Sequence, residues 1–367
     1  MSPLQGVHVL DLSLLLPGPL CTQILRDMGA RVTKIEPPAP GDYMALWPPM
    51  VGDVSAGYLA VNRGKEVISL DLKDETGLRQ FLELAQTADV VVEGFRPGVI
   101  DRLGIGYRRL CELNRRIIVC SISGYGGSGP LSQRAGHDLN YQALAGVLSI
   151  SGGDTPANPQ LQAADTAGGS YVGAMLVLAA LLEREKTGQG RHIDLSMSEQ
   201  LLPLITPAFA AAAADNRNAR RDGEVLSGGA ACYRIFRTAD GRHLSVGALE
   251  PKFWQSLVDV LELPELKDVN HVDVDNSGPV IEKLRQAFAA KTLDVWIERF
   301  ARADACVEPV LTFEEVKQHP QWQARQSFEA VSTPDGRTLR LPKMPASLAG
   351  FNTPEPPRHS GESQPAV

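Results

Sequence analysis

The chain has 367 residues, of which 43% are hydrophobic and 22% are charged. This composition is that of a folded protein with a sizeable core and excludes a mainly disordered chain, and the length fits one large domain and one smaller domain. The 36 Lys and Arg residues against 43 Asp and Glu residues give a net charge of −7. Because no bulk positive field is available for a nucleic-acid backbone, we expect no nucleic-acid partner, and any phosphate ligand must be held by local cations.

Short β-branched runs alternate with helix-like stretches through the first half of the chain. The pattern predicts strands at 8–12, 30–35, 67–72, 90–92 and 116–121 and helices at 20–28 and 76–87. An apolar helix at 170–185 and a strand at 191–195 continue the alternation. Strands that alternate with helices form right-handed crossovers and a mainly parallel sheet covered on both faces. The sequence therefore predicts a doubly wound α/β large domain with a smaller α/β domain.

A change of composition marks the predicted domain boundary, where five alanines at 210–214 give way to a polar run at 215–222. A hairpin around 239–241 and helices at 252–261 and 280–299 are predicted after it. The predicted organisation is a large domain at 1–213 that is completed by 321–357, a linker at 214–229, a small α/β domain at 230–320 and a tail at 358–367.

Several features bear on compartment, membranes and metals. The longest apolar runs, 171–182 and 201–214, are too short to span a bilayer, so we expect no membrane segment. The first residues carry no basic or apolar leader, which is typical of a cytoplasmic protein. The cysteines form no Cys-x-x-Cys motif or Cys/His cluster, which predicts buried free thiols and no metal site. They are Cys21, Cys111, Cys120, Cys232 and Cys306.

A glycine-rich loop, Gly124 to Gly129, literally satisfies the GxGxxG pattern of dinucleotide-binding proteins. That fingerprint belongs at the first strand-to-helix turn, with an acidic residue about 20 positions further on. Here Pro130 follows the loop, and the next stretch carries His137 instead. We interpret the segment as a glycine loop beside a ligand and not as a nicotinamide or flavin site.

One imidazole and two carboxyl groups stand in stretches that are otherwise apolar or small: His137, Asp165 and Glu250. Such groups are costly to bury as spectators and their pKa values shift easily, which makes them candidates for proton transfer or nucleophilic attack. Each also has an ordinary interpretation. His137 fits a structural histidine, Asp165 fits a helix N-cap, and Glu250 fits a hydrogen bond to the backbone.

These three segments occur together with Gly18-Pro19, Asp71-Leu72-Lys73, 93–98, 188–190 and 304–311. In their order and their residue identities, from Val9 to about Pro357, these motifs resemble those of the α-methylacyl-CoA racemases of the type III CoA-transferase superfamily. The resemblance implies an acyl-CoA thioester as substrate, so that CoA is part of the substrate and no separate cofactor is needed. It also implies an obligate homodimer of two interlocked protomers.

The resemblance further implies a set of CoA-binding residues. They are Leu70, Asp71, Leu72, Lys73, Gly94, Phe95, Arg96, Arg102, Gly136, Asp138, Leu139, Asn140 and Tyr141. The cations in this set suit the phosphates of CoA, because an acidic protein must supply discrete positive charges. Many relatives carry an Arg after the acidic residue that ends the second strand, whereas Pro37 follows Glu36 here. Arg63 and Lys65 are the candidate substitutes.

Two chemistries are implied at Asp165. A transferase uses this carboxylate as a nucleophile and forms an anhydride and then a CoA thioester on it. A racemase removes the α-proton from one face and returns a proton on the other, which requires two acid/base groups.

We expect His137 and Asp165 to be that pair, with Glu250 orienting His137, because transferases commonly carry an aromatic residue at the position of His137. The glycine-rich segment 227–233 resembles the racemase version of the corresponding loop. A family III CoA-transferase acting through Asp165 is the alternative, and a non-catalytic acyl-CoA-binding protein is the third hypothesis.

Overall fold

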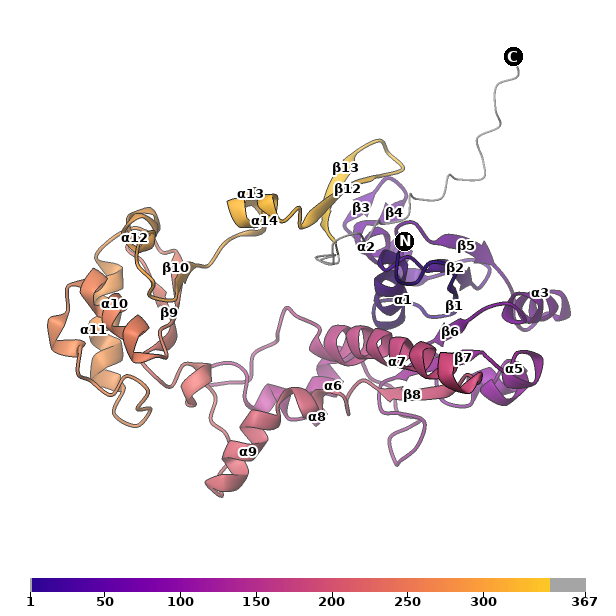
Figure 1. The fold of residues 1–367 in the computed structure, drawn as a ribbon, viewed down its shortest axis with the longest axis horizontal. Helices are drawn as coiled ribbons and strands as arrows, with labels where there is room; N and C mark the ends of the chain where they lie inside the picture. Colours follow the sequence, from indigo (N-terminus) through magenta and orange to yellow (C-terminus); the bar gives the residue numbers. More distant parts are fainter. Residues whose placement is uncertain (1, 344–367) are drawn as a thin grey trace, which may run out of the picture. The chain divides into compact units, whose positions relative to one another are not determined.

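The computed structural model describes residues 2–343, which pack into two compact units (Figure 1). The first unit holds the chain up to Ala145, Gln160–Leu204 and the chain from Pro320, and the second holds Gly146–Pro159 and Ile205–His319. The second unit thus begins before the predicted linker and also takes in a segment from the predicted large domain. The predicted tail at 358–367, like 344–357, lies outside the described residues.

A six-stranded parallel sheet forms the centre of the first unit, as the sequence predicts. In spatial order its strands are β5 (Glu66–Ser69), β2 (Arg31–Glu36), β1 (His8–Asp11), β6 (Val90–Glu93), β7 (Ile118–Ser123) and β8 (His192–Ser196). The strands β1 and β6 are buried along their whole length because helices cover both faces. The chain order reverses between β1 and β6, and in doubly wound sheets the crevice at the carboxyl ends of the strands at this point is where ligands bind.

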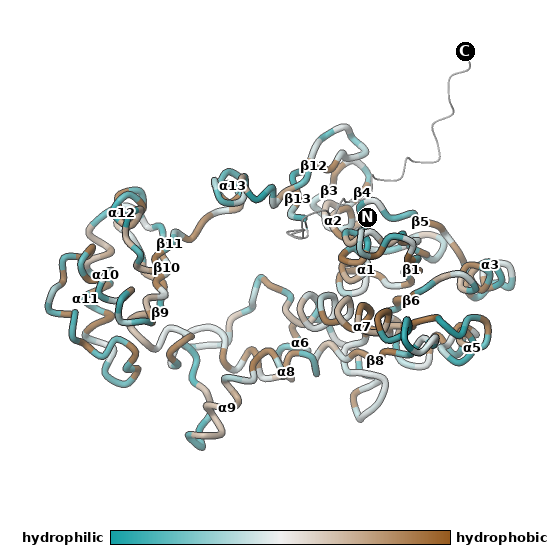
Figure 2. The backbone as a smooth tube through the Cα atoms, viewed as in Figure 1, coloured by the Kyte–Doolittle hydropathy of each residue, from teal (hydrophilic) through white to brown (hydrophobic). Residues whose placement is uncertain are grey.

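Helices cover the two faces of the sheet in pairs. On one face α3 (Glu75–Ala85) and α5 (Tyr107–Leu113) bury Phe81 and Leu110 against the strands. On the other face α1 (Pro17–Asp27) and α7 (Val172–Thr187) pack together (Figure 1). A Cβ atom at Gly173 of α7 would lie 3.2 Å from Cys21 Sγ on α1, so the absence of a side chain there lets the two helices approach closely. Figure 2 shows most of α7 as hydrophobic.

The apolar helix begins earlier than the predicted 170–185. A π-helical segment, η3 (Ala164–Tyr171), leads directly into α7. Together they form a 24-residue helix, long and apolar enough to cross a membrane, with a hydropathy of 1.4 and 44% of the apolar window buried. The apolar run at 171–182, which was judged too short to span a bilayer, is only part of this helix. A core helix of a soluble protein meets the same criteria, and here the buried side packs on the sheet and on α1.

Four charged side chains are completely buried beside the ends of β1 and β2. Lys65 Nζ lies 3.0 Å from Asp11 Oδ2, and Lys34 Nζ lies 3.2 Å from Asp42 Oδ2. Although burial opposes the charged form of Asp11, the neighbouring Lys65 and Lys34 lower the pKa of its carboxyl to about 2. Lys34 also donates to the carbonyl of Ser13 at 2.8 Å, which ties the cluster to the loop that follows β1.

Replacing Lys65 by Met is expected to destabilise the protein by about 3 to 5 kcal/mol, because Asp11 then remains as a buried charge without its closest partner. Urea denaturation measures the loss. The double variant Lys65→Met, Asp11→Leu is the control and should recover most of the stability, since it leaves no unpaired charge. A single variant within 1 kcal/mol of wild type, roughly the value of a surface pair, would contradict this account.

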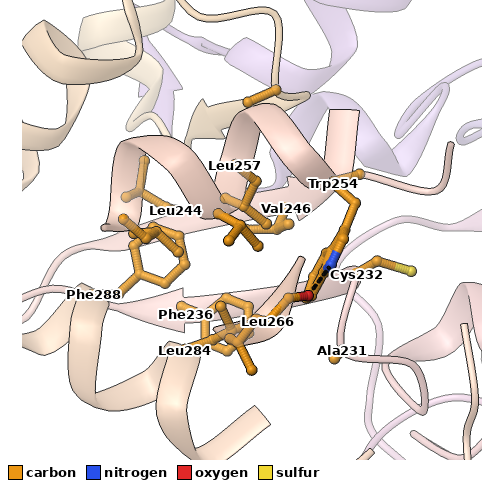
Figure 3. Packing of buried hydrophobic residues seen from close by; sticks show 14 of the residues in the cluster. Ala231, Cys232, Phe236, Leu244, Val246, Trp254, Leu257, Leu266, Leu284 and Phe288 are labelled. Atoms are coloured by element: carbon orange, nitrogen blue, oxygen red, sulfur yellow. Dashed lines mark hydrogen bonds between the residues drawn. The ribbon is translucent and has the colours of Figure 1, made fainter. Parts of the chain in front are cut away.

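The second unit is a small α/β unit with its own core. The predicted hairpin is confirmed as β9 (Tyr233–Arg237) and β10 (His243–Gly247), and β11 (Val307–Pro309) pairs with β10. Against this sheet pack α10 (Pro251–Leu261), α11 (Gly278–Ala289) and α12 (Leu293–Phe300). Figure 3 shows the core around Phe288, where the Trp254 indole also donates to the carbonyl of Leu266 at 2.8 Å.

The prediction of one helix over 280–299 was wrong. The chain leaves the helix after Ala289 and begins α12 at Leu293. The break is held by the hairpin turn, because the N–H of Ala239 donates to the carbonyl of Lys291 and the Asp240 carboxylate accepts the N–H of Leu293. These contacts come from residues about fifty positions away in the sequence.

The remaining elements are short. In the first unit they are η1 (Tyr43–Leu46), β3 (Met50–Val51), β4 (Val54–Ser55), α2 (Ala56–Asn62), α4 (Val99–Arg102), α6 (Asp138–Leu144), α8 (Leu201–Leu204), α14 (Pro320–Ala324), β12 (Phe328–Ser332) and β13 (Thr338–Pro342). In the second unit they are η2 (Val147–Ser149), α9 (Thr206–Ala214), η4 (Val225–Ser227), η5 (Pro264–Leu266) and α13 (Phe313–Gln318).

Candidate active site

A cavity of about 570 Å³ opens in the first unit at the carboxyl ends of the central strands. Its walls come from the loops after β1, β6 and β7, and from the segments that carry His137 and Asp165. This is the place where the strand order reverses and where doubly wound folds bind their ligands. The structure therefore brings together two of the three predicted acid/base residues.

His137 directly precedes α6 and lines the cavity with an exposed side chain. Its backbone N–H donates to Asn140 Oδ1 at 3.0 Å, which fixes the start of the helix. The Tyr141 hydroxyl donates to the carbonyl of Gly136, and its ring meets Tyr125 edge to face with the centroids 5.1 Å apart. The segment around His137 is thus held at both ends while the imidazole stays accessible.

Asp165 is carried into the cavity by η3. The glycines of this helix permit a close approach, because a Cβ atom at Gly168 would lie 2.7 Å from the carbonyl oxygen of Met197. The Ser170 hydroxyl donates to the carbonyl of Pro17 at 2.8 Å and ties the helix to the start of α1. Ala163, not Asp165, occupies the N-cap position, so the ordinary interpretation of Asp165 as a helix cap does not apply.

The protonation of Asp165 is shifted strongly. Burial of its carboxyl and the nearby charge of Asp138 raise its pKa from 3.8 to about 7. Near neutral pH such a group is present both as an acid and as a base. A pKa close to the working pH is what general acid/base catalysis requires, whereas a carboxylate nucleophile is active only in its ionised form.

The predicted CoA-binding residues divide into two groups. Six of them line the cavity: Gly94, Phe95, Arg96, Gly136, Asn140 and Tyr141. Leu70 to Lys73 follow β5 and Arg102 ends α4, outside the cavity walls, while Leu139 is exposed on α6. Asp138 is buried and points into the unit, as described below. The role of these residues toward CoA stays a prediction.

The loop after β1 forms a wall of the cavity that was not predicted from the sequence. Leu15 in this loop has a positive φ of 65°, and its N–H donates to the buried Asp42 carboxylate at 3.1 Å. Tyr43 and Arg134 also line the cavity without having been predicted. Pro17 and Gly18, which line the cavity where α1 begins, were the available signal, because a glycine there permits close backbone approach.

Neither proposed substitute for the cation missing at Pro37 is free to bind a ligand. Arg63 donates to Asp27 Oδ2 at 2.9 Å and to Glu329 Oε1 at 2.5 Å. Lys65 is enclosed in the buried pair with Asp11. Both cations are therefore used to hold the first unit together.

Glu93, at the end of β6, holds the part of the cavity wall that follows this strand. Glu93 is 4% exposed, and its carboxylate accepts the N–H of Phe95 at 2.7 Å. Burial raises the pKa of Glu93 to about 7. The cavity wall formed by Gly94 to Pro97 therefore rests on a carboxyl that is expensive to ionise.

Glu93→Gln is expected to change how stability depends on pH. Because the pKa of the folded state lies above the ordinary 4.5, the wild type loses stability as pH rises from about 4.5 to 7, by about 3 kcal/mol. Gln does not ionise, so the variant should gain that much relative to wild type between pH 5 and 8 in urea denaturation. Glu185→Gln, on an exposed surface, is the control. An unchanged difference between variant and wild type at the two pH values would contradict the assignment.

Glu250 belongs to the second unit, where it precedes Pro251 at the start of α10 with an exposed side chain. Its predicted action on His137 stays a prediction. Among residues 2–343 no group of three or more His, Cys, Asp and Glu side chains is placed to hold a metal ion. The cysteines are free, and the prediction of buried thiols was wrong for the exposed Cys306 and only partly right for the half-buried Cys111.

A doubly wound unit with a carboxyl of raised pKa and a histidine on one cavity has the features of an enzyme active site. The chain belongs to CoA-transferase family III, whose family model matches residues 4–362. It is therefore an enzyme of the superfamily that contains both CoA-transferases and acyl-CoA racemases, and the predicted resemblance is confirmed at this level.

Racemases and CoA-transferases are both found among the relatives that this chain is similar to. It is 39% identical over 327 residues to the α-methylacyl-CoA racemase of Homo sapiens, covering 89% of this chain and 82% of that protein. It is 36% identical over 330 residues to the succinyl-CoA:glutarate CoA-transferase of Homo sapiens, covering 88% and 74%. The crystal structure of a CAIB/BAIF family protein from Brucella suis matches the fold with a TM-score of 0.80 at 27% identity, covering 94% of this chain and 97% of that one.

Proposed function

We propose that this protein is a racemase that interconverts (2R)- and (2S)-2-methylacyl-CoA thioesters. One observation carries the proposal: His137 and Asp165 line the same cavity, and the pKa of Asp165 is raised to about 7. An enzyme that works in both directions needs each group as a base for one isomer and as an acid for the other. A pKa near neutrality supplies both forms of Asp165.

In the proposed reaction one group, as a base, takes the α-proton, and the electron pair of the C–H bond moves into the thioester carbonyl to give an enolate. The other group, in its protonated form, then donates a proton to the opposite face of the α-carbon. The thioester bond stays intact, and the two groups end with their protonation states exchanged. Gly136, His137, Asn140 and Tyr141 of the segment 136–141 line the cavity, and the N–H groups of the last three are bonded within the segment. We propose that the backbone N–H of Gly136 takes part in stabilising the enolate oxygen.

A family III CoA-transferase acting through Asp165 is the second candidate. It is favoured by the 36% identity to the human succinyl-CoA:glutarate enzyme. In that reaction the Asp165 carboxylate attacks the thioester carbonyl, CoA leaves as the thiolate, and an acyl-aspartyl anhydride forms. A raised pKa lowers the fraction of Asp165 that is ionised at neutral pH, and this reaction gives His137 no role.

Incubation of the protein with one chiral 2-methylacyl-CoA in D2O, without any acceptor acid, separates the candidates. The proposal predicts that deuterium enters the α-position and that optical purity is lost, as followed by NMR. The absence of exchange, together with CoA transfer once a carboxylic acid is added, would establish the transferase instead. Absence of both reactions would leave a binding protein and refute the proposed activity.

We further propose that CoA enters as part of the substrate, with no separate cofactor, and that the protein acts in the cytoplasm. The protein forms a homodimer, which is supported by an apolar stripe on the helix η3–α7, where Tyr171, Met175 and Leu182 are 52%, 56% and 65% exposed. Stripes of this kind mark protein contacts. Sedimentation of the chain as a 39.6 kDa monomer would contradict the dimer.

A further inference from the structure

We infer that Asp138 is a positioning residue for Asp165, because its carboxylate ties the first turn of η3 to the start of α6 and keeps a negative charge beside the Asp165 carboxyl. The inference deepens the proposed function and rests on it for the reaction. It departs from the prediction that Asp138 binds CoA.

The contacts of Asp138 are directed into the first unit. Asp138 is 9% exposed, and its Oδ1 atom accepts the N–H of Ala164 at 2.8 Å and the N–H of Asp165 at 3.1 Å. Its Oδ2 atom accepts from the Gln142 amide at 2.6 Å. The N–H groups at the start of a helix have no partner within that helix, and the N-cap residue Ala163 has no side chain that could serve. A carboxylate from 26 positions earlier in the sequence therefore caps η3.

This connection matters because Asp138 directly follows His137. A single side chain thus joins the backbone that presents one proton carrier to the backbone that presents the other. Proton transfer at a carbon requires the reacting atoms in near-attack geometry, and a displacement of about 1 Å costs up to about 100-fold in rate. We attribute the placement of the His137 and Asp165 backbones relative to each other to these hydrogen bonds.

The same carboxylate affects the charge on Asp165. Burial contributes most to the raised pKa of Asp165, and the negative charge of Asp138 raises it further. Other titratable groups face the same space: Tyr141 on α6, Tyr125 after β7 and Arg96 after β6. His137 adds an imidazole at the cavity wall. Among these titratable groups of the described residues, Asp138 is the one whose side chain accepts a hydrogen bond from the Asp165 backbone.

Asp138→Asn separates the two effects. The amide oxygen can still accept the N–H groups of Ala164 and Asp165, but the charge is gone. In the direction in which Asp165 is the base, the acid limb of the kcat/KM profile for α-proton exchange is expected to move to lower pH by about one unit. KM for the acyl-CoA should change less than about threefold. Asp138→Ala, which also loses the cap, is expected to lose about 100-fold in kcat.

Asp74→Asn is the matched control, because Asp74 caps α3 in the same way, through the N–H groups of Thr76 and Gly77, away from the cavity. It should leave the pH profile unchanged. An acid limb that stays in place in Asp138→Asn would overturn the inference. A rise in KM at constant kcat would also overturn it and would return Asp138 to the CoA site.

A readout without turnover keeps the inference distinct from the proposed function. The 13C signal of the Asp165 carboxyl, identified by its loss in Asp165→Asn, is titrated in wild type and in Asp138→Asn. We expect its midpoint to fall by about one unit in the variant. If wild type shows no exchange while this shift is present, the proposed reaction fails and the positioning role stands. An unmoved midpoint refutes the role of the Asp138 charge.

Discussion

Asp165→Asn is expected to abolish racemisation and, at the same time, to stabilise the folded protein above neutral pH. Asn has the shape of Asp but neither takes up nor releases a proton under these conditions. Removal of a positioned acid/base group costs about 10² to 10⁴ in rate. The rate of racemisation, measured by the loss of optical rotation of a single isomer, should therefore fall by at least 100-fold.

The gain in stability follows from the sign of the pKa shift. The pKa of Asp165 in the folded state is about 7 against an ordinary 3.8, so the wild type loses stability as pH rises through this interval. A full shift corresponds to about 4 kcal/mol, and partial solvent access reduces the value to about 2 to 4 kcal/mol. Urea denaturation at pH 4 and pH 8 should show the variant gaining stability over wild type at the higher pH only. A variant that is equally or less stable at pH 8 would contradict the raised pKa.

His137→Gln has the second large effect, because it removes the other proton carrier and keeps a polar side chain at the start of α6. We expect racemisation to fall by about 10² to 10⁴. The far-UV circular dichroism should be unchanged, since the imidazole is exposed and the backbone bonds of the segment do not depend on it. The measurement is the racemisation rate together with CoA transfer to an added carboxylic acid.

His192→Gln is the control for this variant. His192 is the first residue of β8 and therefore lies at the end of this strand that is away from the cavity. Its ring forms a hydrogen bond with the Ser121 hydroxyl. It should retain full activity. If His137→Gln loses no racemisation, His137 is not the second proton carrier and the two-group account is wrong. If the variant retains CoA transfer while wild type shows no racemisation, Asp165 acts as a nucleophile.

Much of the first unit was predictable from the sequence because its signals are local. Buried parallel strands such as β1 and β6 are short β-branched runs, and the turns between them carry glycine and proline. The segments of His137 and Asp165 were recognisable for a related reason. A polar group in an apolar stretch stands out in the sequence regardless of the fold.

What escaped prediction depends on contacts between distant residues. The capping of η3 by Asp138 joins positions 26 apart, and nothing near Asp138 in the sequence indicates it. The break between α11 and α12 depends on Asp240, and the turn at Leu15 depends on Asp42. In each case a carboxylate, buried for Asp138 and Asp42 and exposed for Asp240, accepts a backbone N–H from another part of the chain. Such hydrogen bonds cannot be predicted from local sequence, because folding brings the donor and the acceptor together from distant positions.

The central claim is that proton carriers lie on both faces of one α-carbon, and one measurement tests it directly. Asp165→Asn and His137→Gln are each incubated in D2O with each isomer of a 2-methylacyl-CoA, and α-deuterium is followed by NMR. The account predicts that each variant exchanges the proton of only one isomer, without inversion, and that the two variants act on opposite isomers. Exchange of the same isomer by both variants, or inversion by either one at the wild-type rate, would contradict it.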